Sequence, residues 1–238
     1  MVLQRSFDLH LIAEQQELEG LMLAPREGCA LDHHAQSDAD YAKASMPDAM
    51  ATPGHGVRPE FDHEFVWAWG LSKTVICAVN GACAGIAVSL AAFCDLRYAV
   101  AGAKFTTATA RLGLPAEYGI SWVLPRIVGL PHAADILLTG RIFTAEEALA
   151  MGFVNGVFPE EDFEARILRM AKGVAESVSP MAARTAKRQL YAELLTHDVG
   201  KAIEDSRTLT GQMMKQADYR EGVAAVKERR LPRFPDPE

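Results

Sequence analysis

Along residues 73–158, short apolar runs are separated by stretches with helical patterning. Four of the runs are rich in β-branched or aromatic residues, which favours strands. These predicted strands cover residues 74–79, 96–100, 103–107 and 154–158. Because strands and helices alternate, the pattern predicts an α/β fold.

Helices are predicted between these strands. An Ala-rich run after Gly81 indicates a buried helix, and a second helix is expected to begin near Ser121, after a loop that Gly and Pro interrupt. Thr144 with Glu147 three residues later forms a capping box, which marks the start of a short third helix.

Beyond Pro159 the pattern is almost entirely helical. The predicted helices cover residues 160–177, 181–196, 199–216 and 219–229, and Asp218 is expected to cap the last of them. We therefore divide the chain into a core over residues 1–180 and a C-terminal helical region over residues 181–238. Apolar residues at helical spacing in this region need a partner surface, either on the core or on a second copy. They are Leu190, Leu194, Leu195, Ile203, Leu209, Met213 and Met214.

The first 70 residues give a weaker pattern. Residues 7–18 predict a short amphipathic helix, and residues 18–24 suit a strand. From residue 25 to about residue 60 the chain is rich in Asp, His, Ala, Gly and Pro, which predicts a long loop. Loops of this length in compact domains are usually functional or mobile.

Residues 75–94 are nearly all apolar and long enough to span a bilayer. Gly81 and Gly85 even form the small-residue pair found in membrane helix dimers. However, Asn80-Gly81 is a strong turn signal in the middle of the run. We therefore interpret the segment as a buried strand, a turn and a buried helix, and expect no membrane partner.

Composition limits the class of protein. The 238 residues are 49% hydrophobic and 23% charged, as in ordinary globular domains. The net charge of -7 provides no basic field for nucleic acid, so we expect no nucleic-acid partner. The four cysteines form no C-x-x-C pair, and the first residues lack the pattern of a secretory signal. A reducing cytoplasm is the expected location.

A metal site is a further possibility that the sequence raises. His33 and His34 lie close to Asp32, Asp38 and Asp40. No helix-spaced histidine pair or flanking cysteine supports metal ligation, so a solvated polar loop is the preferred interpretation and no metal is expected.

The predicted strand–turn–helix over residues 74–92 has a chemical consequence. At a helix N-terminus the first N–H groups are unpaired and carry partial positive charge. Here they belong to Gly85, Ile86 and Ala87, and Gly85 permits close approach of a ligand. Such a turn can hold a carbonyl oxygen that gains negative charge, as half of an oxyanion hole. A turn with no ligand is the alternative.

Five segments together resemble the enoyl-CoA hydratase/isomerase, or crotonase, superfamily. They cover residues 73–85, 93–108, 111–129, 137–159 and 220–234, in the family's order and spacing. The resemblance implies a crotonase-like ββα spiral core with a C-terminal helical trimerisation region. It also implies acyl-CoA thioester substrates, a homotrimer or homohexamer, and no separate cofactor, since coenzyme A is part of the substrate. The family's N-terminal hairpin has no evident counterpart in this sequence.

The resemblance also implies roles for individual residues. In the family two backbone N–H groups polarise the thioester carbonyl, and the first falls on Ile86, next to Gly85. Residues 28–32 are similar to the segment that supplies the second donor, which places it on Leu31 beside Ala30. A chance match in a polar loop is the alternative for Leu31. Asp95 in the family's Cys-Asp pattern is expected to link strand and helix structurally.

The family's hydratases use two glutamates, whose positions are occupied here by Ser89 and Thr109. Neither can act as a carboxylate base, so two-glutamate hydration is excluded. Glu117 lies where related isomerases keep a single catalytic carboxylate. Its apolar neighbours should desolvate it and raise its pKa, which suits a base that removes and returns a proton. Without the resemblance, a solvated surface charge would be the preferred interpretation.

Arg229 and Arg230 match a basic position that often meets the coenzyme A phosphates. A charged helix end is the alternative, since cations are favourable there. Three functions follow from the sequence. The first is isomerisation of an enoyl-CoA double bond by Glu117, the second is 2-enoyl-CoA hydration with this one carboxylate, and the third is acyl-CoA binding without catalysis.

Overall fold

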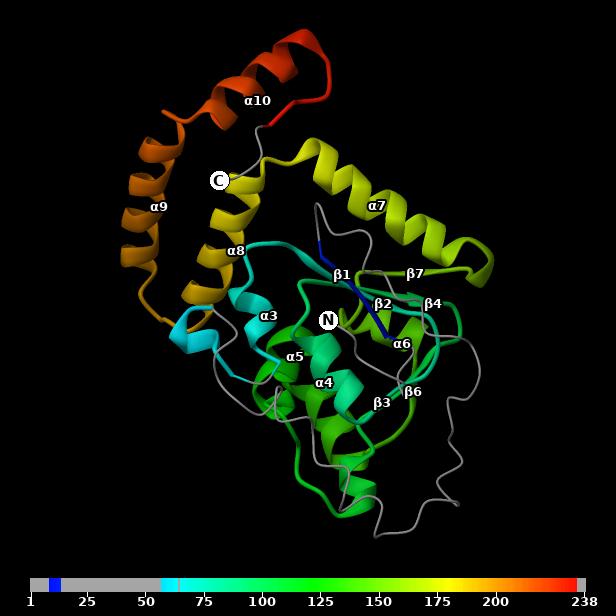
Figure 1. Ribbon diagram of the computed structural model, residues 1–238. Helices are drawn as coiled ribbons and strands as arrows, with labels where there is room; N and C mark the ends of the chain where they lie inside the picture. The colour runs from blue at the N-terminus through cyan, green and yellow to red at the C-terminus, as the bar shows by residue number, and fades with distance from the viewer. Residues whose placement is uncertain (1–8, 14–56, 64, 235–238) are drawn as a thin grey trace.

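The structure is a computed structural model, and it describes residues 9–13, 57–63 and 65–234. Figure 1 shows strands and helices packed into a mixed core, with helices α8, α9 and α10 at one end of it. Ala30 and Leu31 lie outside the described residues, as do the predicted strand over residues 18–24 and the paired histidines.

Two sheets form the centre of the core. The larger has the strand order β1-β2-β4-β7, in which β1 is antiparallel to β2 and the other neighbours are parallel. Its strands are β1 (Leu9–Ala13), β2 (Val75–Val79), β4 (Leu96–Val100) and β7 (Gly156–Phe158). The smaller has the order β3-β5-β6, formed by β3 (Cys83–Ala84), β5 (Lys104–Thr106) and β6 (Phe143–Thr144).

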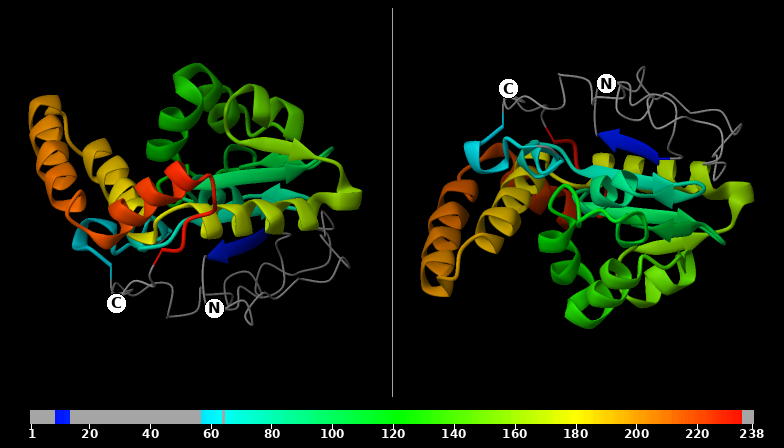
Figure 2. Two further views of the ribbon diagram at one scale, coloured as in Figure 1. Left: turned by 90° about the horizontal axis from the view of Figure 1, so that it is seen from above. Right: turned by 90° about the horizontal axis from the view of Figure 1, so that it is seen from below.

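Helices cover the sheets and form the C-terminal region. Those of the core are α3 (Trp67–Gly70), α4 (Ile86–Ala92), α5 (Ile120–Thr139), α6 (Ala145–Ala150) and α7 (Phe163–Ser177). Those that follow are α8 (Pro180–Leu194), α9 (Val199–Met213) and α10 (Ala217–Glu228). Short 3-10 turns are η2 (Pro59–Phe61), η3 (Thr109–Leu112) and η4 (Glu160–Asp162). In Figure 2, α9 lies at the far end of the molecule from the sheets, and none of its residues is buried.

The apolar segment over residues 75–94 contains the predicted strand, turn and helix, and the structure adds the two-residue strand β3 between the turn and the helix. Strand β2 is buried along its whole length, and α4 buries all its residues except the first. In the described part of the chain, no helix combines the length and the apolar composition needed to cross a bilayer. Strand β4 has the predicted bounds, and β5 and β7 lie within theirs.

The helix predicted over residues 7–18 is wrong where the structure describes it. Leu9–Ala13 is a strand, with Leu9 opposite Val79 in an antiparallel pair. Strand β2 is buried and has β4 on one edge, so its other edge needs a backbone partner. Pairing with β2 therefore determines the conformation of this segment, although its local sequence pattern is weakly helical.

The cap predicted for the last helix is also wrong. Gln216 is the N-cap residue of α10, and its side chain makes no cap hydrogen bond. Asp218 is instead buried and accepts a hydrogen bond from the Ser179 hydroxyl at the start of α8. A buried carboxylate needs such a partner more than a solvated helix end needs a cap.

A buried lysine joins α8 to the core. Lys187 Nζ donates hydrogen bonds to the main-chain oxygens of Ala68 (2.8 Å) and Lys73 (2.7 Å) and to Asp95 Oδ2 (2.7 Å). Asp95 Oδ2 also accepts from the Val75 N–H at 2.6 Å. Burial lowers the pKa of Lys187, although the Asp95 carboxylate opposes this. These contacts agree with the structural role predicted for Asp95.

Candidate active site

Gly85 forms a sharp corner before α4. Its φ of 57° and ψ of -124° suit glycine alone, and its N–H donates to the Thr106 oxygen at 2.8 Å. A β-carbon at Gly85 would have no described atom within 4 Å, so the space beside this corner is open. Among the hydrogen bonds of the described residues, none uses the N–H of Ile86 as donor. This amide is therefore available to donate a hydrogen bond to a ligand.

Glu117 lies in the loop between η3 and α5 and is half-buried. Its main-chain oxygen accepts hydrogen bonds from the Ile120 N–H at 3.1 Å and from the Ser89 hydroxyl at 3.4 Å. Ser89 is buried in α4, one turn after Ile86. The loop that carries Glu117 is thus attached to the helix that begins with the free amide.

The backbone beside Glu117 is strained. Of the non-glycine residues that the structure describes, four have positive φ. Three of them surround the site: Tyr118 (49°) follows Glu117, Ala108 (57°) precedes Thr109, and Phe65 (62°) contacts Tyr118 with ring centroids 5.0 Å apart. Strained backbone of this kind clusters at functional sites. Phe65 belongs to no motif, so sequence reasoning missed it.

The two positions where the family's hydratases have glutamates are buried. Ser89 is 3% exposed and Thr109, the first residue of η3, is 5% exposed. Both are hydroxyl side chains, which cannot take up a proton as a carboxylate does. Neither position can therefore replace Glu117 as the base that the sequence predicts.

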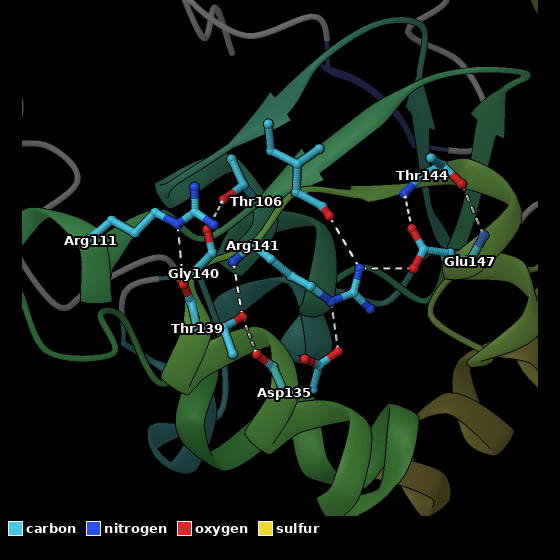
Figure 3. A network of polar contacts seen from close by, with 9 residues as sticks. Thr106, Arg111, Asp135, Thr139, Gly140, Arg141, Thr144 and Glu147 are labelled. Atoms are coloured by element: carbon cyan, nitrogen blue, oxygen red, sulfur yellow. Dashed lines mark hydrogen bonds and ion pairs between the residues drawn. The ribbon is translucent and has the colours of Figure 1, made fainter.

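A polar network around Arg141 joins three elements of the core (Figure 3). Arg141 forms ion pairs with Asp135 (2.7 Å) and Glu147 (2.8 Å). Glu147 also accepts from the Thr144 N–H at 2.9 Å, within the predicted capping box. The hydrogen bonds that Arg141 donates to Asp135 and Glu147 raise the pKa of Arg141. The hydrogen bonds that Glu147 accepts from the Thr144 N–H and from Arg141 lower the pKa of Glu147. The network joins α5, β6 and α6.

The same network reaches the corner before α4. The Thr106 hydroxyl donates to the Gly140 oxygen at 3.1 Å, and Arg111 Nε donates to the Thr139 oxygen at 3.2 Å. The main-chain oxygen of Thr106 accepts the hydrogen bond from the Gly85 N–H. The network therefore holds β5, the strand to which this corner is hydrogen-bonded.

The two arginines predicted to meet coenzyme A phosphates differ in their contacts. Arg230 forms ion pairs with Glu221 (2.5 Å) and Glu228 (2.6 Å), and the Arg230 guanidinium lowers the pKa of Glu221 to about 2. Arg229 ends α10 with a φ of 53° and is exposed. In Figure 1, α10 lies at the top of the molecule, whereas α4 lies in the core beside the sheets.

Other reactive side chains are poorly suited to catalysis. Cys77, Cys83 and Cys94 are buried thiols that form no disulfide, and burial raises the pKa of Cys77 well above its usual value. Such thiols are weak nucleophiles. Among the described residues, no three His, Cys, Asp or Glu side chains gather as metal ligands.

The comparisons with known proteins identify the family. The family model described as enoyl-CoA hydratase/isomerase matches residues 44–237. A probable enoyl-CoA hydratase of Rhodobacter capsulatus is 34% identical over 182 residues, which are 75% of this chain and 68% of that protein. The 1,2-epoxyphenylacetyl-CoA isomerase of Escherichia coli is 35% identical over 165 residues, or 69% of this chain and 62% of that protein. The chain belongs to the enoyl-CoA hydratase/isomerase family.

Solved structures agree with this assignment. The crystal structure of a probable enoyl-CoA hydratase/isomerase from Mycobacterium abscessus has a TM-score of 0.69 and 31% identity, and the match covers 71% of this chain and 68% of that one. The predicted crotonase-like α/β fold is thereby confirmed. Because the matches span 55% to 68% of the first three curated relatives, this chain corresponds to part of their length. The names of the relatives include both hydratases and isomerases.

Proposed function

We propose that this protein is an acyl-CoA enzyme that moves the double bond of an enoyl-CoA thioester through an enolate. One observation carries the proposal. The loop with Glu117 is hydrogen-bonded to α4, the helix whose first N–H group, on Ile86, has no acceptor among the described residues. A base and an oxyanion donor are thus held by adjoining elements, as proton transfer next to a thioester requires.

In the proposed reaction, the thioester oxygen of a 3-enoyl-CoA accepts a hydrogen bond from Ile86. The Glu117 carboxylate removes a proton from C2. The electron pair of that C–H bond forms a double bond between C1 and C2, and the π pair of the carbonyl moves onto the thioester oxygen, which gives a dienolate. The amide of Ile86 stabilises this charge. Glu117 then returns the proton to C4, which gives the 2-enoyl-CoA and restores the carboxylate. Leu31 is retained as the proposed second donor, and Ala30 and Gly85 as residues that contact the thioester.

Hydration of a 2-enoyl-CoA is the second candidate, favoured by the hydratase names of relatives such as that of Rhodobacter capsulatus. In this chain it would depend on Glu117 alone to place the water, because Ser89 and Thr109 replace the family's two glutamates. Isomerisation needs only one carboxylate, which is why we favour it.

Assembly and location are also proposals. Leu190, Leu194, Leu195, Ile203 and Met214 in the C-terminal region are exposed in the single chain, so the core does not cover them. We propose that they are covered in a homotrimer or homohexamer in the cytoplasm. Light scattering after size exclusion that gives the monomer mass of 25.9 kDa would contradict the assembly.

Product analysis tests the reaction. We expect the protein to convert 3-enoyl-CoA to 2-enoyl-CoA, and Glu117→Gln to lower this rate by about 10²–10⁴-fold, the usual contribution of a general base. Glu164→Gln, an exposed glutamate on α7, is the matched control and should keep full activity. Formation of 3-hydroxyacyl-CoA from 2-enoyl-CoA would favour hydration. Tight binding of both esters without turnover would favour a non-catalytic role.

A further inference from the structure

We propose that Phe65 is a positioning residue that aims the Glu117 carboxylate by holding Tyr118. This inference rests on the proposed function and adds to it a residue outside the family's motifs. Phe65 is 2% exposed, and its ring meets that of Tyr118 edge to face, with centroids 5.0 Å apart and an interplanar angle of 69°. Tyr118 directly follows Glu117, so this contact acts on the residue next to the base.

The backbone conformations explain why the contact matters. Tyr118 has a φ of 49° and Phe65 a φ of 62°. In this region the β-carbon of a non-glycine residue approaches a carbonyl oxygen, so the surrounding structure must hold such residues in place. Here two strained aromatic residues pack on each other. The ring contact therefore helps to keep Tyr118 in its left-handed conformation.

Other contacts hold the rest of the Glu117 loop. The Ser89 hydroxyl and the Ile120 N–H bind the main-chain oxygen of Glu117. At Gly119, the position of a β-carbon lies 3.3 Å from Cζ of Phe93. With the loop held on these sides, a change at Tyr118 would turn the Glu117 side chain relative to the Ile86 amide. Proton transfer is sensitive to displacements of about 1 Å, so turnover should fall.

Phe61 provides a matched control. It lies in the same segment as Phe65 and is 1% exposed, but its ring contacts Trp69, with centroids 6.4 Å apart. Phe61→Leu and Phe65→Leu therefore remove the same atoms from equally buried sites. We would measure kcat and KM for 3-enoyl-CoA isomerisation and the melting temperature of both variants, with wild type and Glu117→Gln alongside.

We expect both leucine variants to lose similar thermal stability. Only Phe65→Leu should lower kcat, by about 10–100-fold, because misplacement of a reacting group by about 1 Å costs up to that much. Its KM should stay within about threefold, since the donor for the thioester oxygen is untouched. In a double-mutant cycle, Phe65→Leu should have no further effect on kcat in a Tyr118→Gly background, because the contact is already lost.

Equal loss of kcat in the two leucine variants, or additive effects in the cycle, would overturn the positioning role. If Phe65→Leu does not fold, Phe65→Met against Phe61→Met gives the same comparison with less lost volume. An inactive wild type would instead refute the proposed function, and the positioning role with it. An active wild type with equally impaired leucine variants would refute the positioning role alone.

Discussion

The hydroxyl of Ser89 donates a hydrogen bond to the main-chain oxygen of Glu117 at 3.4 Å. This contact joins α4, which begins with the proposed oxyanion donor, to the loop that carries the proposed base. By the family resemblance, Ser89 occupies the position of a hydratase glutamate. With serine at this position, the site lacks a carboxylate that would activate water. The Ser89 hydroxyl instead holds the main chain of Glu117, the proposed base.

Replacing Ser89 by alanine should therefore lower kcat without abolishing it. A neutral hydrogen bond contributes about 0.5–1.5 kcal/mol, and at 3.4 Å the low end applies, so we expect roughly a threefold loss. Steady-state kinetics on 3-enoyl-CoA would measure this. Ser177→Ala, which removes an exposed bond to the Gly173 oxygen at the end of α7, is the control. An unchanged kcat in Ser89→Ala would show that the contact has no role in turnover.

Gly85→Ala should affect activity far more than stability. The conformation of Gly85 costs any other residue about 1–3 kcal/mol, and relief of that strain would shift the Ile86 amide. Loss of one oxyanion donor lowers kcat about 10²–10³-fold. Gly102→Ala is the matched control, because Gly102 also has positive φ (79°) and open space around it but lies in the turn after β4. We expect both variants to have a lower melting temperature than wild type and only Gly85→Ala to lose activity.

Arg229 should act on the nucleotide end of the substrate. It is exposed, whereas Arg230 is held by Glu221 and Glu228. An exposed ion pair contributes about 0.2–1 kcal/mol, so Arg229→Ala should raise KM for a coenzyme A ester by up to about fivefold. The pantetheine thioester, which lacks the nucleotide phosphates, should show no change in KM. An equal rise for both substrates would exclude phosphate binding, and Arg207→Ala on α9 serves as the control.

Lys187→Met should destabilise the protein strongly. The variant leaves the Asp95 carboxylate, whose side chain is 12% exposed, without its cation, and loss of a partner from a buried pair typically costs about 3–5 kcal/mol. Lys201→Met, which breaks an exposed pair with Asp205, should cost less than about 1 kcal/mol. Urea unfolding of the three proteins gives these differences. Comparable losses in the two variants would contradict the docking role of Lys187.

The pH dependence of stability should differ between wild type and Lys187→Met. Burial lowers the pKa of Lys187 in the folded state, so the unfolded chain binds more protons in the window between this lowered value and the usual lysine pKa of about 10.4. The contribution of Lys187 to stability therefore rises with pH across that window. Urea unfolding at several alkaline pH values should show wild type gaining stability relative to the variant. A falling difference would contradict the stated direction.

The sequence predicts elements whose signals are local. Strand β4 has the predicted bounds, and Thr144 with Glu147 forms the predicted capping box. The failures involve partners far away in the chain. Strand β1 exists because it pairs with β2, and Asp218 accepts a hydrogen bond from Ser179 instead of capping its own helix. Strands β3 and β6 have only two residues each, too few for any periodicity.

The same distinction applies to the candidate site. The sequence predicts the unpaired amide of Ile86 from a strand–turn–helix pattern within one segment, and it predicts Glu117 from a family motif. The support of Glu117 by Ser89, and the contact of Phe65 with Tyr118, join segments that no local pattern relates. Left-handed backbone at Phe65 and Tyr118 has no signal in aromatic residue types, since such residues rarely adopt it.

The most direct test of the proposed chemistry is a crystal structure with a bound saturated acyl-CoA, which resembles the substrate but has no double bond to move. We expect the thioester oxygen to lie about 2.7–3.1 Å from the Ile86 nitrogen. The carbon next to the thioester should lie about 3–3.5 Å from a Glu117 carboxylate oxygen. A thioester oxygen bound elsewhere, or a Glu117 carboxylate turned away into solvent, would contradict the account.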